Sequence, residues 1–215
     1  MLILDFFFED EDEDEDEWKD DFQSTMILPI VKYGHPVLRQ KGAAIERITP
    51  EIKKLIADMF ETMRERHGVG LAAQQIGRAL QLTVIDVREA GVDRPSTLEL
   101  KGKPAEVDSI MPLVLINPEI KPDGEPATGG EGCLSFPEIF GEITRPGFAD
   151  VKALNEKGRV VEFRAGGLLS RAIQHEADHL NGILFIDRMS KKTKEEIRDE
   201  LDALQKATKA ELQKK

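Results

Sequence analysis

The residues best suited to chemistry form the run His175-Glu176-Ala177-Asp178-His179. On an α-helix, side chains four residues apart lie one turn above each other on the same face, so both imidazoles can reach one metal ion. Glu176 lies beside them, where its carboxylate can take a proton from a water molecule that the ion activates. Two of the four histidines in the chain have this spacing. The pattern therefore predicts a metal site on a helix rather than two ordinary histidines.

A catalytic metal site usually has three protein ligands, so the two histidines need a third partner. In the arrangement H-E-x-x-H-x-x-G-x-x-H the last histidine would fall at position 185, where the chain has Phe185. Downstream glutamates are the other common source of a ligand, and the chain offers Glu195, Glu196 and Glu200. These three belong to the charged run KKTKEEIRDEL, which is typical of the solvated face of a surface helix.

Cys133 is the better candidate for the third ligand. It is the only thiol in the chain, and it lies in the tight polar stretch Glu131–Ser135 rather than on an apolar helix face. The alternative is a buried free cysteine that packs as a small hydrophobe. A Cys-His-His set is tetrahedral and borderline-soft, so it can hold zinc or ferrous iron.

A glycine-rich run, Gly68–Gln75, reads GVGLAAQQ. A phosphate-binding loop would end in Lys-Ser or Lys-Thr or would follow a strand, whereas a helix is predicted before this run, so the phosphate interpretation is weak. Small residues let the backbone approach a ligand closely. The side-chain amide of Gln75 is a donor that can stabilise an oxyanion.

The elements that position these residues are predicted from apolar periodicity and turn residues. Thr49 and Pro50 have the residue types of a helix N-cap and first helical position. A long polar surface loop is expected over 88–112. The other expected elements are a helix from Pro50 that ends before Gly68, strands over 80–87 and 113–117, a hairpin over 149–165 that turns at Asn155–Gly158, a helix over 168–180 that ends at Asn181-Gly182, and a charged C-terminal helix.

The order of these elements indicates the fold class. Strands and helices without a regular βαβ order are typical of an α+β fold. We therefore expect small antiparallel or mixed sheets packed around a central metal-binding helix, followed by the C-terminal helix.

Composition places the chain among globular proteins that can bury a core. Its 215 residues are 40% hydrophobic and 33% charged, enough for one domain of ordinary size. No apolar stretch approaches the ~20 residues of a membrane-spanning helix. The single cysteine excludes an internal disulfide and fits a reducing compartment, so a cytoplasmic location is expected.

The net charge of −11 is confined to one end of the chain. Residues 1–25 hold twelve acids and one base, Lys19, whereas the remainder is balanced, which excludes a nucleic-acid binder that works by bulk charge. Nine successive acids repel one another, so residues 1–25 are predicted to be a disordered tail. The alternatives are a docking arm for a basic partner and an extension before a working start at Met26. The predicted division is this tail, a catalytic domain over 26–190 and a charged helix over 191–215.

Taken together, GVGLAAQQ, EGCLS and HEADH resemble, in this order, the three signature motifs of the peptide deformylases. Each motif matches without a gap, and the similarity extends from about Met26 to about Ser190. The acidic tail is not part of the family pattern. The resemblance implies a metal-dependent hydrolase that removes the N-formyl group from N-formylmethionyl nascent peptides and releases formate.

The resemblance also implies a role for each matching residue. Cys133, His175 and His179 would hold the metal, with ferrous iron expected in the cell and zinc or nickel in preparations. Glu176 would act first as the general base and then as the acid. Asp178 would either support a ligand histidine or lie on the helix surface.

The remaining motif residues are implied to bind the substrate. The side-chain amide of Gln75 and the backbone N–H of Leu134 would form the oxyanion hole, and the backbone of Gly70 would bond the peptide. Three residues fall where the family lines the pocket for the methionine side chain: Val69, Arg171 and Ala172. Arg171 departs from an apolar lining, unless its aliphatic stem packs there while its charged head reaches water.

Two rival functions use the same residues. An endopeptidase with this helix is disfavoured by Phe185, and an inactive relative that serves as a binding module is disfavoured because both Glu176 and Gln75 are present. Since family members act on chains that leave the ribosome, the C-terminal helix is a candidate ribosome contact. Acids counter its lysines, so an ordinary solvated helix is the alternative.

Overall fold

The computed structural model describes residues 25–90 and 94–214, so the predicted acidic tail, apart from Thr25, lies outside the described residues. The helices are α1 (Pro50–Glu65), α2 (Gly167–Leu180), α3 (Lys191–Glu196) and α4 (Arg198–Leu212), with a short 3-10 helix, η2, at Ala73–Ile76. The strands are β1 (Gly70–Ala72), β2 (Leu82–Ile85), β3 (Ser96–Leu100), β4 (Lys103–Ala105), β5 (Leu113–Cys133), β6 (Phe136–Leu154) and β7 (Val160–Gly166).

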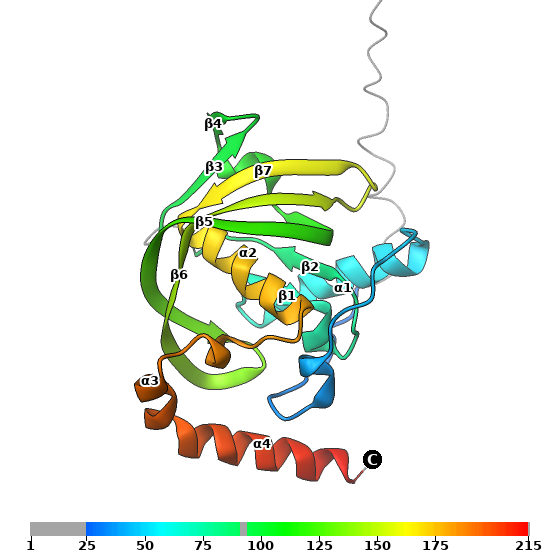
Figure 1. Ribbon diagram of the computed structural model, residues 1–215. Helices are drawn as coiled ribbons and strands as arrows, with labels where there is room; N and C mark the ends of the chain where they lie inside the picture. Colours follow the sequence, from blue (N-terminus) through cyan, green and yellow to red (C-terminus); the bar gives the residue numbers. More distant parts are fainter. Residues whose placement is uncertain (1–24, 91–93, 215) are drawn as a thin grey trace, which may run out of the picture.

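The described strands form a seven-stranded sheet, which gives the α+β fold that the sequence predicts. The strand order is β1-β2-β5-β6-β7-β3-β4, and each neighbouring pair is antiparallel. Figure 1 shows α2 crossing the middle of the molecule, with the curved strands β5 and β6 beside it and α4 at the edge. The central helix and the C-terminal helix are therefore confirmed.

Helix α2 is central because most of its residues are apolar or find partners inside the protein. Nearly all of them are buried, and Leu169 and Ile173 pack among the side chains of β2, β5, β6 and β7. The helix begins at Gly167, whose φ is +64°, and its C-cap is Asn181, followed by Gly182 at φ +71°. These bounds confirm the helix predicted over 168–180.

Strands β5 and β6 form the hairpin that carries Cys133 to α2. They are 21 and 19 residues long. Their pairing begins with Ile116 opposite Leu154 and ends with Cys133 opposite Phe136. Shifts of register, among them one between Asp123 and Pro126, let the strands bend. The strand predicted over 113–117 and the first strand of the hairpin predicted over 149–165 are only the outer ends of β5 and β6, and no element was predicted between them. Prolines and glycines in that stretch interrupt the alternation of a strand, but both residues are tolerated at bulges.

The prediction of a long polar surface loop over 88–112 was wrong. Residues of this stretch form the hairpin of β3 and β4, which turns at Lys101-Gly102, and β3 also pairs with β7. Only Leu98 of these two strands is deeply buried. Because an edge hairpin needs few apolar residues, its sequence lacks the alternation that identifies a half-buried strand.

The other local predictions agree with the structure. The Thr49 hydroxyl accepts a hydrogen bond from the Ile52 N–H and caps α1, and Gly158 has φ +74° in the predicted turn between β6 and β7. The charged C-terminal helix is interrupted at Ile197, which separates α3 from α4. Among residues 25–90 and 94–214, none of the helices has both the length and the apolar character that crossing a bilayer requires.

Candidate active site

Three possible metal ligands converge from two elements. Cys133 ends β5, and His175 and His179 lie one turn apart on α2. The Sγ atom of Cys133 lies 3.3 Å from Nε2 of His179, and one ligand atom from each residue can be chosen so that all three lie within 4.8 Å of one another. The sequence places 41 residues between the thiol and the first histidine, and the bent hairpin closes that separation.

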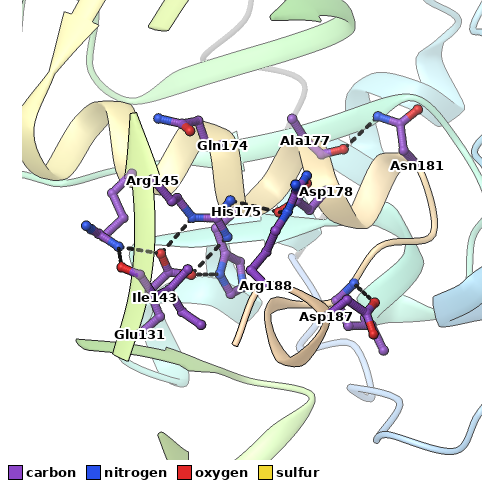
Figure 2. Close-up of polar contacts among 12 residues, drawn as sticks. Glu131, Ile143, Arg145, Gln174, His175, Ala177, Asp178, Asn181, Asp187 and Arg188 are labelled. Carbon is purple, nitrogen blue, oxygen red and sulfur yellow. Dashed lines mark hydrogen bonds and ion pairs between the residues drawn. The ribbon is translucent and has the colours of Figure 1, made fainter. Parts of the chain in front are cut away.

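A buried carboxylate orients one of the histidines. The Nδ1 atom of His175 lies 2.9 Å from Glu131, which leaves Nε2 free for a ligand. Glu131 also accepts two hydrogen bonds from Arg145, at 2.7 and 3.0 Å, and one from Arg171 at 2.8 Å. Figure 2 shows Glu131, Arg145 and His175 together beside α2. Burial opposes ionisation of this carboxyl, yet the hydrogen bonds from His175 and Arg145 hold the pKa of Glu131 well below its usual range.

Arg145 connects the hairpin to the helix. Besides its contact with Glu131 on β5, it donates to Asp178 on α2 at 2.8 Å. Asp178 also accepts hydrogen bonds from Arg188, so it is a buried ion-pair partner rather than an acid on the helix surface. Among the hydrogen bonds of the described residues, its carboxylate has none to His175 or His179. That supporting role belongs to Glu131 instead.

Glu131 and Arg145 were not among the site residues predicted from the sequence. One signal was present for Glu131, because residues two apart on a strand share a face, and Cys133 is two residues further on. Arg145 offered no comparable signal. Its position opposite Ala127 in the β5–β6 pairing is visible only in the fold.

Removing one partner of the buried ion pair between Glu131 and Arg145 should destabilise the fold. Glu131→Gln leaves the charge of Arg145 poorly compensated in the interior, so we expect the free energy of unfolding to fall by roughly 3–5 kcal/mol. Urea unfolding in the presence of a chelator measures this change without a contribution from bound metal.

Glu138→Gln is the matched control for this measurement. Glu138 is exposed and makes no ion pair within residues 25–90 and 94–214, so its variant should stay within about 0.5 kcal/mol of the parent. Equal stability of the Glu131 and Glu138 variants would show that Arg145 does not need Glu131 as its partner in the interior.

Glu176 lies in the same cleft, close to the backbone of β1. Its Oε2 atom is buried and has no hydrogen-bond partner among the described residues, and burial raises the pKa of Glu176 to about 7. A Cβ atom at Gly70 would lie 2.5 Å from Oε1 of Glu176, so only glycine leaves room for this carboxylate. A carboxyl group with this pKa can accept and return a proton near neutral pH.

Gln75 presents its amide to the thiol. Its Oε1 accepts a hydrogen bond from the Ala72 N–H at 2.8 Å, and its Nε2 donates to Cys133 Sγ at 3.4 Å. The first contact fixes which end of the amide faces the cleft. Gln75 is buried on η2, and Leu134 lies at the adjoining turn between β5 and β6.

The site opens into a cleft of about 730 Å³. Its lining includes every predicted site residue except the buried His179: Val69, Gly70, Gln75, Cys133, Leu134, Arg171, Ala172, His175 and Glu176. The guanidinium of Arg171 does not extend into water, because it donates to Glu131 and to the carbonyls of Ile143 and Ala127. The aliphatic stem of Arg171 can therefore line the cleft while Glu131 neutralises its charge.

The donor set fits a divalent metal ion of borderline-soft character. A thiol and two imidazoles are ligands that zinc and ferrous iron both accept, and Glu131 orients one imidazole for that purpose. With the carboxyl of Glu176 and the amide of Gln75 beside them, these residues have the chemistry that a metal-dependent hydrolase requires.

Comparison with known proteins identifies which hydrolase family this is. The family model described as polypeptide deformylase matches residues 27–195, and the chain belongs to this peptide deformylase family. It is 48% identical to a peptide deformylase of Opitutus terrae over 187 aligned residues, and the alignment covers 86% of this chain and 96% of that protein. The identity to the peptide deformylase of Methylacidiphilum infernorum is 47%, over 84% of this chain and 94% of that protein.

Solved structures agree with this family membership. A crystal structure of a plant peptide deformylase superposes with a TM-score of 0.73 at 36% identity, covering 89% of this chain and 96% of the plant one. The peptide deformylase from Thermotoga maritima gives a TM-score of 0.64 at 40% identity, covering 78% of this chain and 99% of the Thermotoga chain. The chain is thus an enzyme of a family that removes the N-formyl group from nascent polypeptides.

Proposed function

We propose that the cleft around Cys133, His175 and His179 is where this chain hydrolyses the formyl amide of N-formylmethionyl peptides. The observation that carries the assignment is the convergence of a lone thiol with the histidine pair, beside the buried carboxylate of Glu176. A divalent ion held by the three ligands would supply the Lewis acidity that makes water reactive near neutral pH.

The substrate is placed by the residues on either side of Glu176. The backbone of Gly70 can approach a peptide closely because no side chain intervenes. We assign Val69 and Ala172, with the stem of Arg171, to the pocket for the methionine side chain, since all three line the cleft next to the reacting centre. The formyl group then points toward Cys133.

The proton and electron movements follow from these positions. The oxygen of water forms a bond to the formyl carbon, and charge that grows on the carbonyl oxygen meets Nε2 of Gln75 and the backbone N–H of Leu134. Because Gln75 is already fixed through Oε1, little reorganisation is needed. Glu176 takes one proton from the water and delivers it to the methionine nitrogen. The C–N bond breaks, and the second proton of the water stays on the formic acid, which then ionises to formate as the released amine takes up a proton.

Release of formate is the direct test of this function. We expect the full chain to release one formate from each molecule of formyl-Met-Ala-Ser, with no cleavage of the internal peptide bonds. Mass spectrometry of the products, with unformylated Met-Ala-Ser as the matched control, distinguishes the outcomes. Internal cleavage would indicate the endopeptidase, and peptide binding without turnover would indicate an inactive relative.

We assign ferrous iron as the metal in the cell, with zinc or nickel as replacements. The support is the mixed sulfur and nitrogen donor set, which accepts all of these ions. Metal analysis of protein purified without oxygen tests the assignment. A preparation that contains zinc alone and keeps its activity in air would contradict it.

We assign the catalytic unit to residues 26–190. We also propose that the enzyme acts in the cytoplasm, on nascent chains at the ribosome. The support for the location is the single cysteine, which fits a reducing compartment. The candidate ribosome contact is the C-terminal helix, whose inner face is held by the buried residues Leu201 and Thr208 and whose other positions are mainly charged. Co-sedimentation of the full chain with ribosomes tests this contact.

A further inference from the structure

The mouth of the active-site cleft carries three exposed basic side chains that the proposed chemistry does not use. They are Lys32, Arg66 and Arg94, and we call them the basic rim. None of the three makes an ion pair with another residue in the described part of the chain, whereas Arg145 and Arg171 deeper in the protein are both paired with Glu131. Among the residues that line the cleft, the exposed acid is Glu138. The described mouth therefore has a positive excess.

The backbone at two of the three rim residues, Lys32 and Arg66, is held in place. The residues on either side of Lys32 are bonded to the site itself, because the Val31 N–H donates to the Gln75 carbonyl at 2.8 Å and the Tyr33 N–H donates to the Ser135 carbonyl at 2.9 Å. Arg66 is the C-cap residue of α1, and its N–H donates to the Thr62 carbonyl. Lys32 and Arg66 thus have fixed starting points at the cleft.

A peptide bound as proposed must pass this rim. Its formyl group lies by Cys133 and its methionine by Val69, so the following residues leave through the mouth. An extended chain advances about 3.3 Å per residue, and a cleft of this size accommodates more than one residue. The side chains after the methionine therefore come within reach of the basic rim.

We propose that the basic rim selects N-formylmethionyl peptides with acidic side chains in the positions that follow the methionine. This inference rests on the proposed function and names its preferred substrate class. The charged residues from 25 onward balance, so the field at the mouth is set by nearby groups rather than by the net charge of the folded part. Unpaired surface charges at separations within the Debye length attract an acidic peptide and repel a basic one.

Matched peptides measure this preference in the full-length protein loaded with metal. We expect formyl-Met-Ala-Asp-Asp to have a higher kcat/KM than formyl-Met-Ala-Lys-Lys, by roughly tenfold at low salt, mainly through KM. The ratio should fall toward one in about 0.5 M salt, where the Debye length is a few ångströms.

Charge-reversal variants locate the source of the preference. The double variant Lys32→Glu, Arg66→Glu should invert the acidic-to-basic ratio of kcat/KM. The double variant Lys157→Glu, Lys206→Glu makes the same change of net charge at exposed positions that do not line the cleft, and it should keep the parent ratio. An equal shift in both variants would assign the effect to net charge and overturn the inference.

The outcomes separate this inference from the proposed function. If formyl-Met-Ala-Ser releases no formate, the function itself fails. If formate is released but acidic, neutral and basic peptides react equally well at low salt, the function stands and the role of the basic rim is refuted.

Discussion

Cys133→Ser should abolish turnover and weaken the binding of soft divalent metals. In the proposed site the Cys133 sulfur and the two histidines would supply the three protein ligands, and a hydroxyl is a poor replacement for sulfur in such a set. Metal content by mass spectrometry and formate release from formyl-Met-Ala-Ser are the two measurements. We expect both to fall together.

Stability without metal provides the control for this variant. With chelator present, Cys133→Ser and the parent should unfold at nearly the same urea concentration, because the substitution only replaces a sulfur atom by an oxygen atom at a half-buried position. Full activity with normal metal content would remove Cys133 from the site, and the proposed reaction centre would be lost with it.

Glu176→Gln should leave the metal bound and lower the turnover number by about 10²–10⁴-fold. The amide has the size of the carboxyl group but cannot accept and return a proton, and Glu176 is not one of the three converging ligands. Stopped assays of formate release, with metal content measured on the same samples, test this expectation.

The same substitution has a second expected effect, of opposite sign. Because burial raises the pKa of Glu176 to about 7, its ionised form is disfavoured in the folded protein, and the neutral amide should unfold at an equal or higher urea concentration at pH 8. Glu200→Gln, at an exposed position on α4, is the matched control and should change neither activity nor stability. Loss of metal from the Glu176 variant would contradict the role of proton carrier.

The sequence was most informative where the physical signal is local. The spacing of His175 and His179, the Thr49 cap and the Gly158 turn each depend on residues within a few positions, and the structure contains all three features. The convergence of Cys133 with α2 was anticipated from chemistry, because two histidines alone leave a metal site incomplete.

The signals that failed are those that depend on distant partners. Prolines and glycines in β5 hide the alternation of a strand, so no part of this strand was predicted beyond residue 117 until the pairing with β6 and its bulges was known. The hairpin of β3 and β4 has few apolar residues because it lies at the edge of the sheet. Arg145 looks like an ordinary charged residue in the sequence, since only the fold shows that it and Glu131 neutralise each other in the interior.

The separation between Arg145 and the basic rim has a consequence for substrate preference. Arg145 joins Glu131 on the hairpin to Asp178 on the helix, so the parts that hold the reaction centre are tied to one another within the interior. Lys32 and Arg66 lie on segments outside that linkage. If the basic rim acts as proposed, substitutions at the entrance can change which peptides are favoured without disturbing the residues of the reaction centre.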